Sequence, residues 1–280
     1  MMSRSCPFWV QVSLVCFVLV LNGSVAMFGQ NYQVKYKIHS QFDSTRANRR
    51  LIEQATLFIE SSQKSYFYTD NFAFKDSLMK QINLGKVSAF EVMGNTENLR
   101  HTRFEQHITK VLNNLEVSLF ENILISDYLC QFQPNFKWEI QSDTLTIKGY
   151  LCNKATGYFG GRTYIAWFTH EIPVADGPYV FCGLPGLIVK VHDDKNHYDF
   201  TLTSLEQTTS SSFLKTPSVG KKVISATREQ VFKARERLRT QFSEVMENEM
   251  GMRLIETPEM KQKRKQDEIS DNNPLELRVD

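Results

Sequence analysis

The sequence predicts a mainly β fold, in which an antiparallel meander is followed by a C-terminal α-helix. Apolar and polar residues alternate with a period of two over much of residues 32 to 205, and turn residues bound these runs. After Gln207 the composition becomes polar, and apolar residues then return at helical spacing. A 12% content of aromatic residues can fill the core of one large β domain.

The first 26 residues predict a cleaved secretory signal. Arg4 gives a positive start, the run from Phe8 to Leu21 is almost wholly apolar, and Ser24 to Ala26 offer small residues for cleavage. A retained membrane anchor is the less favoured alternative, because the run is shorter than the ~20 residues that a span needs. We therefore expect a chain from Met27 that lies in the periplasm or cell envelope, with no transmembrane span after signal removal.

Charge excludes one class of partner. Without Arg4 the chain keeps 32 Lys and Arg against 31 Asp and Glu, which is close to neutral. The basic run in KQKRKQDE is closed by acidic residues and contains no aromatic residue, so we expect no nucleic-acid partner. Three regions are predicted: a signal peptide at 1–26, an antiparallel β domain at 27–210, and a polar linker, charged helix and terminal strand at 211–280.

The N-terminal part of the β domain contains one clear strand and one hairpin. Alternation predicts the strand at residues 32–38. The segment 55–74 predicts a hairpin that turns at Ser61 to Lys64, with Leu57 and Ile59 opposite Tyr66 and Tyr68. Residues 76–100 show no clear period, which leaves short strands or a loop.

Residues 103–169 form the clearest meander. Two or more short strands are expected in 104–123, a turn at Gln141 to Thr144, and a strand that begins after Gly161 and ends at Pro173. A further hairpin follows, with its turn at Asp193 to Asn196, and Gly186 marks its entry.

The C-terminal part predicts a helix that starts after Thr227, a suitable N-cap residue. The final NNPLEL predicts a short strand. The helical spacing is carried by the apolar residues Val231, Leu238, Phe242 and Val245.

Few residues suggest reactive chemistry. The mature chain has three cysteines, which allow at most one disulfide and one free thiol, or three buried thiols: Cys130, Cys152 and Cys182. His192 and His197 flank a turn with two Asp residues, yet such a turn favours Asp for backbone reasons alone. We therefore expect no metal and no cofactor.

The GLPG at residues 183–186 does not match a phosphate-binding loop. Its proline lacks a backbone donor, a strand follows it instead of a helix, and no Lys-Ser or Lys-Thr comes after it. No Gly-x-Ser-x-Gly is present, and the apolar neighbours of Cys182 favour a protonated thiol. The GLPG turn is therefore predicted to be a rigid structural corner.

Residues 149–193 resemble the GLPGLI family of secreted Bacteroidota proteins. The resemblance rests on the following residues: Cys152, Lys154, Ala155, Gly161, Arg162, Tyr164, Ala166, Trp167, Ile172, Pro173, Gly177, Pro178, Gly183, Leu184, Pro185, Gly186, Leu187 and Ile188. The terminal NNPLEL is similar to the family's usual ending, with Leu275 in place of Ile. The resemblance implies a curved sheet or half-open barrel, as in periplasmic lipoprotein carriers, and it implies no assigned activity.

Three functions compete at this point. The preferred one is a non-enzymatic binding or carrier module for a lipid or peptide, with an apolar groove that the 173–186 loop partly closes and with Arg162, Trp167 and Glu171 as ligand-binding residues. The second is a hydrolase or peptide-modifying enzyme that adds Asp176 and Cys182 to these three. The third is an assembly partner of an outer-membrane protein, with the C-terminal helix as the contact.

Overall fold

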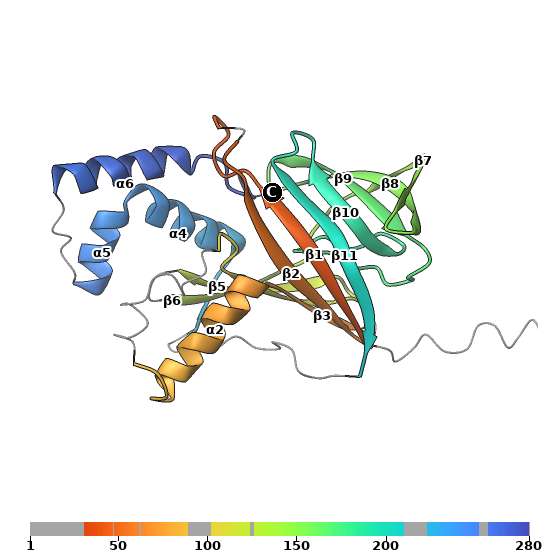
Figure 1. Cartoon of the computed structure of the whole chain (residues 1–280), viewed down its shortest axis with the longest axis horizontal. Helices are drawn as coiled ribbons and strands as arrows, with labels where there is room; N and C mark the ends of the chain where they lie inside the picture. Colours follow the sequence, from red (N-terminus) through yellow and green to blue (C-terminus); the bar gives the residue numbers. More distant parts are fainter. Residues whose placement is uncertain are drawn as a thin grey trace, which may run out of the picture.

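The computed structural model describes residues 31–46, 48–61, 63–88, 102–123, 126–209, 223–251 and 257–279. The predicted signal peptide and most of the predicted linker lie outside these residues. A twelve-stranded sheet dominates the fold (Figure 1). Its strands are β1 (Asn31–Ser40), β2 (Leu51–Glu60), β3 (Lys64–Thr69), β4 (Gln106–Val111), β5 (Glu116–Ile123), β6 (Ser126–Phe132), β7 (Glu139–Ile147), β8 (Tyr150–Phe159), β9 (Arg162–Thr169), β10 (Leu187–Asp193), β11 (Tyr198–Thr208) and β12 (Val223–Ser225). The helices are α2 (Asp70–Asn83), α4 (Arg228–Thr240), α5 (Phe242–Met250) and α6 (Pro258–Ser270).

The sheet is built from two meanders that meet at its centre. The strand order is β12-β6-β5-β4-β3-β2-β1-β11-β10-β9-β8-β7, and β1 is antiparallel to both β2 and β11. Every pair is antiparallel except β12 with β6, which runs parallel over three residues. The predicted mainly antiparallel β architecture is therefore confirmed, and the sheet stays open between its edges.

The sheet curves strongly because a short connection joins its distant parts. β6 and β7 stand ten steps apart in the strand order, about 48 Å in a flat sheet with ~4.8 Å between strands. The chain from Phe132 to Glu139 can reach only about 25 Å at full extension. Curvature brings the strands close enough for this connection, as the predicted half-open barrel requires.

Residues 170–186, here called the inner segment, fill the inside of the curve. The segment joins β9 to β10 without regular structure, and β9 ends at Thr169 rather than at the predicted Pro173. Asp176 pairs with Lys110 of β4, while Trp138, just before β7, donates a hydrogen bond from Nε1 to the Cys182 carbonyl at 2.8 Å. Contacts with such distant strands show that the chain itself occupies the groove predicted between them.

Strand parity explains which residues enter this core. In β1 every second residue is buried, as the alternation in the sequence predicts. The same core cluster contains apolar side chains of β1, β2, β4, β5, β8 to β11 and the inner segment. Phe181 lies at its centre, with ring contacts to Phe136, Tyr164, Tyr179 and Phe200.

The register predicted for the β2–β3 hairpin was wrong by one residue. Leu57 pairs with Phe67, and Phe58 pairs with Tyr66. Lys64 belongs to β3 and pairs with Glu60, so the turn has three residues instead of four. A shift of one residue moves each side chain to the opposite face, and Tyr66 therefore faces away from Leu57.

The helix α2 was not predicted. The predicted hairpin strand continued to Phe74, where the chain is already helical. The Thr69 hydroxyl caps this helix by accepting a hydrogen bond from the Phe72 amide at 3.2 Å. Phe72 is the one residue of α2 that is buried in the described chain, so the apolar stripe that reveals a helix is almost absent.

The turn predicted at Gln141 to Thr144 was also wrong. These residues form an irregularity inside β7, and the turn to β8 lies at Lys148 and Gly149. Both residues have positive φ angles, 52° and 88°. An edge strand can be as polar as a turn, so the polar residues 141–144 of β7 led to the wrong prediction of a turn.

The C-terminal helix begins as predicted and then breaks. Thr227 and Gln230 form a capping box at the start of α4. The helix ends at Thr240, α5 follows, and the charged run lies in a third helix, α6. The tail at residues 271–279 has no regular structure and does not form the predicted strand.

Candidate functional site

The three residues predicted to bind a ligand do not converge. Arg162 and Trp167 lie on β9 an odd number of residues apart, so their side chains point to opposite faces of the sheet. Glu171 is exposed, and its carboxylate accepts a hydrogen bond from the Leu151 amide at 2.9 Å. Their role in ligand binding stays a prediction, and the structure does not bring them to one cavity.

Arg162 is buried and holds the C-terminal tail. Its Nε donates to the Leu275 carbonyl at 2.9 Å, and its Nη2 donates to Asn273 Oδ1 at 2.6 Å and the Pro274 carbonyl at 2.7 Å. Its Nη1 pairs with the buried Asp193 at 3.0 Å. The tail NNPLEL and the strand that starts at Arg162 are thus parts of one structural unit.

Most of the remaining motif residues lie in β8, the inner segment and the start of β10. Cys152 and Ala155 of β8 are buried, and Lys154 pairs with Trp167 across the β8–β9 ladder. Gly177 packs directly on Ile188, because a Cβ at this glycine would lie 2.8 Å from the Ile188 Cβ. Pro178 is buried, whereas Pro173, Gly183 and Pro185 are exposed at the bends of the inner segment. Leu184, Gly186, Leu187 and Ile188 are buried where this segment enters β10.

Gly186 requires the absence of a side chain. Its φ is +153°, and a Cβ built there would lie 2.0 Å from the Thr169 carbonyl oxygen. The corner predicted from GLPG therefore exists. Close packing on β9 explains why its last residue, Gly186, is glycine.

The cysteines are buried free thiols. No disulfide joins Cys130, Cys152 and Cys182, each of which is at most 1% exposed. Burial raises the pKa of Cys152 to about 11 and that of Cys182 to about 12. At neutral pH these thiols stay protonated, so they are poor nucleophiles.

The predicted turn at Asp193 to Asn196 is structural. The Asp193 carboxylate accepts a hydrogen bond from the Tyr198 amide at 2.7 Å in addition to its pair with Arg162. In the described ranges, no group of three or more His, Cys, Asp or Glu side chains is arranged to hold a metal ion. In the same residues, no helix has the length and apolar composition needed to cross a membrane.

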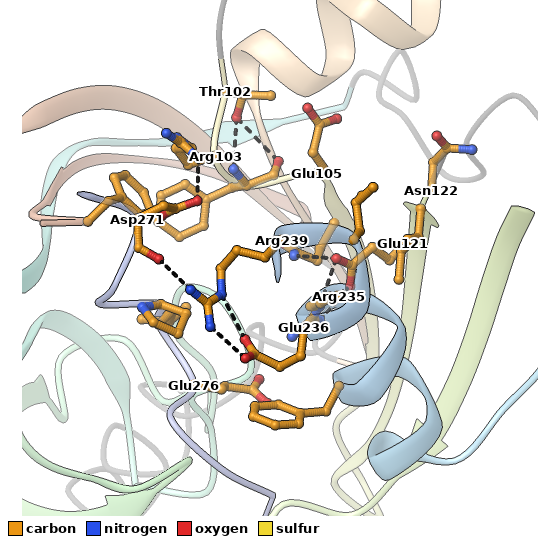
Figure 2. A pocket seen from close by; sticks show the side chains of 18 of the residues that line it. Thr102, Arg103, Glu105, Glu121, Asn122, Arg235, Glu236, Arg239, Asp271 and Glu276 are labelled. Carbon is orange, nitrogen blue, oxygen red and sulfur yellow. Dashed lines mark hydrogen bonds and ion pairs between the residues drawn. The ribbon is translucent and has the colours of Figure 1, made fainter. Parts of the chain in front are cut away.

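A half-open cavity of about 430 Å³ lies between the helices and the sheet. This cavity, here called the apolar pocket, is walled by the start of β4, the end of β5, the helices α4 and α5, and the tail (Figure 2). Its apolar lining residues are Phe42, Phe104, Ile123, Phe232, Leu238, Phe242, Pro274 and Leu275. The volume is in the range of small-ligand sites.

Most charged side chains in the wall of the apolar pocket are paired with one another. Arg235 of α4 binds both carboxylate oxygens of Glu121, with two of the distances at 2.7 Å. Arg239 binds the two oxygens of Glu236 at 2.7 and 3.1 Å (Figure 2). Burial lowers the pKa of the Arg235 guanidinium, but attraction to the Glu121 carboxylate raises this pKa by more. The net shift is therefore upward, and the guanidinium stays charged.

Glu276 connects the pocket to the inner segment. Its carboxylate accepts a hydrogen bond from the Tyr179 hydroxyl and forms an ion pair with Arg228, whose Nη2 lies 3.2 Å from Oε2. Burial, and then the Glu276 carboxylate, raise the pKa of Tyr179 well above its usual range. The tail, α4 and the inner segment therefore form one continuous wall.

The sequence contains a signal for this pocket in α4. Val231, Arg235, Leu238 and Phe242 follow one another at helical spacing, so a charged residue interrupts the apolar stripe of α4. A charge on the inward face of a helix predicts a buried partner, which is Glu121 of β5. The identity of that partner depends on the sheet and could not be read from the helix.

Comparison with known proteins finds a family model that matches a short part of the chain, and it gives no activity. Residues 160–190 match the family model described as "Protein of unknown function (Porph_ging)". This match covers β9, the inner segment and the start of β10, which is the region of the GLPGLI resemblance. No curated protein matches the chain.

Solved structures give only distant similarities. Two crystal forms of PNGF-II align with TM-scores of 0.49 at 15% and 16% identity, over 75% of this chain and 34% and 33% of theirs. The chain therefore spans about a third of those proteins. The LolA superfamily protein NE2245 from Nitrosomonas europaea aligns with a TM-score of 0.25 and 9% identity, over 64% of this chain and 86% of that one.

Proposed function

We propose that this protein is a non-enzymatic binding module of the periplasm or cell envelope, and that it holds an acyl chain in the apolar pocket. The observation that carries the proposal is the pocket itself. It is half open, and most of its lining surface is apolar, with apolar side chains from β5, α4, α5, the tail and the segments that follow β1 and precede β4. The predicted secretory signal supports the location.

The pairing of the polar groups favours an acyl chain over a peptide. A peptide in the apolar pocket would bring amide groups that lose their hydrogen bonds to water, at a cost of about 1–3 kcal/mol for each unpaired group. Glu121, Glu236 and Glu276 already have arginine partners, and the Arg235 guanidinium is engaged by Glu121. An acyl chain needs no hydrogen-bond partner, so this wall suits it.

The state of the cysteines supports binding over thiol chemistry. The enzyme hypothesis included Cys182, and Cys152 is the other thiol in the region of the GLPGLI resemblance. Both are buried, and burial raises their pKa values far above neutral pH. Neither lines the apolar pocket.

The first test is native mass spectrometry of the protein secreted to the periplasm of an expressing cell, followed by solvent extraction. We expect a copurified lipid of defined mass. The variant Phe232→Asp puts a carboxylate in the apolar wall and should weaken acyl-chain binding roughly 10- to 100-fold, from the ~1.5–3 kcal/mol of a buried Phe side chain.

The matched control is Met260→Asp. Met260 is 55% exposed on α6 and does not line the pocket, so this variant should carry the same lipid load as the wild type. An apo mass for the wild type, together with no binding of added dodecyl maltoside, would contradict the proposal. Equal loading of the two variants would place the ligand outside the apolar pocket.

A further inference from the structure

A second hollow adjoins the apolar pocket. It has a volume of about 550 Å³ and is lined by Phe42, Asp43, Arg49, Arg50, Leu51, Thr102 and Arg103. Three of these residues, Phe42, Thr102 and Arg103, also line the apolar pocket. Because the two cavities share this wall, they lie next to each other. The second cavity is here called the arginine hollow.

The arginine hollow carries an excess of positive charge. Arg49, Arg50 and Arg103 are exposed and lie around it, whereas Asp43 is the one acidic residue in its lining. The Asp43 side chain is only 2% exposed. It is already engaged by Arg46, whose Nε lies 3.3 Å away, and by the Thr45 amide at 2.9 Å. The exposed charge that a ligand meets is therefore cationic.

Arg103 stands at the boundary of the two cavities. Its backbone amide is fixed by the Glu53 carboxylate at 3.1 Å, and its guanidinium lies over the Phe42 ring at 5.2 Å. Its Nη1 donates to Asp271 at 2.7 Å, and Figure 2 shows the two side chains meeting at the pocket wall. Among the described residues, Asp271 is its one side-chain acceptor, which leaves further N–H groups for an anion.

We propose that the ligand is an anionic amphiphile, with its acyl chain in the apolar pocket and its phosphate or carboxylate in the arginine hollow. This rests on the proposed function and adds the chemistry of the head group. Guanidinium groups bind phosphate and carboxylate oxygens through pairs of parallel hydrogen bonds. The shared wall at Phe42 and Arg103 places an aromatic face beside the tail and a cation beside the head.

The test compares three probes by isothermal titration calorimetry of the secreted full-length chain. Dodecyl phosphate carries both groups, dodecyl maltoside carries the same chain without the charge, and inorganic phosphate carries the charge alone. The two amphiphiles are used below their critical micelle concentrations. We expect dodecyl phosphate to bind about tenfold or more tightly than dodecyl maltoside, with a preference that shrinks as salt is raised.

Arginine variants test whether the preference for dodecyl phosphate over dodecyl maltoside arises in the arginine hollow. Arg50→Gln and the double variant Arg49→Gln/Arg50→Gln should remove most of the preference and leave dodecyl maltoside affinity within about twofold of the wild type. Both arginines are exposed, so folding should survive, and circular dichroism checks it. The control Lys64→Gln/Lys148→Gln removes two exposed charges, one beside the end of β2 opposite to Leu51 and one in the β7–β8 turn, and should leave the preference intact.

Each outcome has a separate meaning. Equal binding of the two amphiphiles, unchanged by the arginine variants, would overturn the head-group assignment and leave the acyl-chain function standing. Binding of neither amphiphile would overturn the proposed function and this inference together. If inorganic phosphate bound as tightly as dodecyl phosphate, the hollow would be a site for free phosphate, and the link between the two cavities would be wrong.

Discussion

Loss of Arg162 should destabilise the fold far more than loss of a similar exposed cation. Arg162→Met keeps much of the apolar stem of the side chain but leaves Asp193 buried at 0% exposure without its cationic partner. It also removes the donors that hold the Leu275 and Pro274 carbonyls of the tail. Breaking a buried pair from one side costs about 3–5 kcal/mol. For a domain of this size that corresponds to a fall in Tm of roughly 6–20 °C.

Lys190→Met is the matched control. The Lys190–Asp199 pair has the same 3.0 Å separation as Arg162–Asp193, but its side chains are 32% and 23% exposed. Water screens this pair, so its loss should cost about 1 kcal/mol or less. Burial is then the main difference between the two substitutions.

Urea denaturation followed by circular dichroism measures both variants, and a third variant tests the cause. Asp193→Asn keeps an acceptor for the Tyr198 amide but removes the charge, so Arg162→Met/Asp193→Asn should lose less stability than the sum of the single changes, by about 2 kcal/mol. Additive effects, or an Arg162→Met midpoint equal to that of Lys190→Met, would refute the reasoning.

Two further predictions concern the inner segment and the thiols. Gly186→Ala should lower the free energy of unfolding, measured by urea denaturation, by about 2 kcal/mol more than Gly149→Ala does. Both glycines have positive φ, but a new Cβ would collide with the Thr169 carbonyl at Gly186, whereas it meets nothing within 4 Å at Gly149. Equal losses would show that the corner adjusts freely. The thiols of Cys130, Cys152 and Cys182 should react with Ellman's reagent slowly in the folded protein at pH 7.5 and completely in urea, since all three are buried and burial raises their pKa values. Rapid labelling of one of them in the native protein would restore the enzyme hypothesis.

Local patterns in the sequence were enough to predict the elements that depend on near neighbours. Period-two alternation identified β1 and β11, because a strand buried on one face must alternate. Thr227 identified the start of α4, because a capping box uses residues only three positions apart. The GLPG corner followed from the conformations that glycine and proline allow.

The candidate site depended on contacts between distant residues, and only the tertiary structure decided it. The sequence suggested an apolar groove inside the sheet, but the inner segment fills that space, with Lys110 and Asp176 paired at its base. The apolar pocket forms instead where α4, β5 and the tail meet. Arg162 was predicted to bind a ligand, yet it holds the tail, which lies more than a hundred residues away in the sequence. Sequence periodicity reports whether a residue faces inward, and the fold decides which residue it meets there.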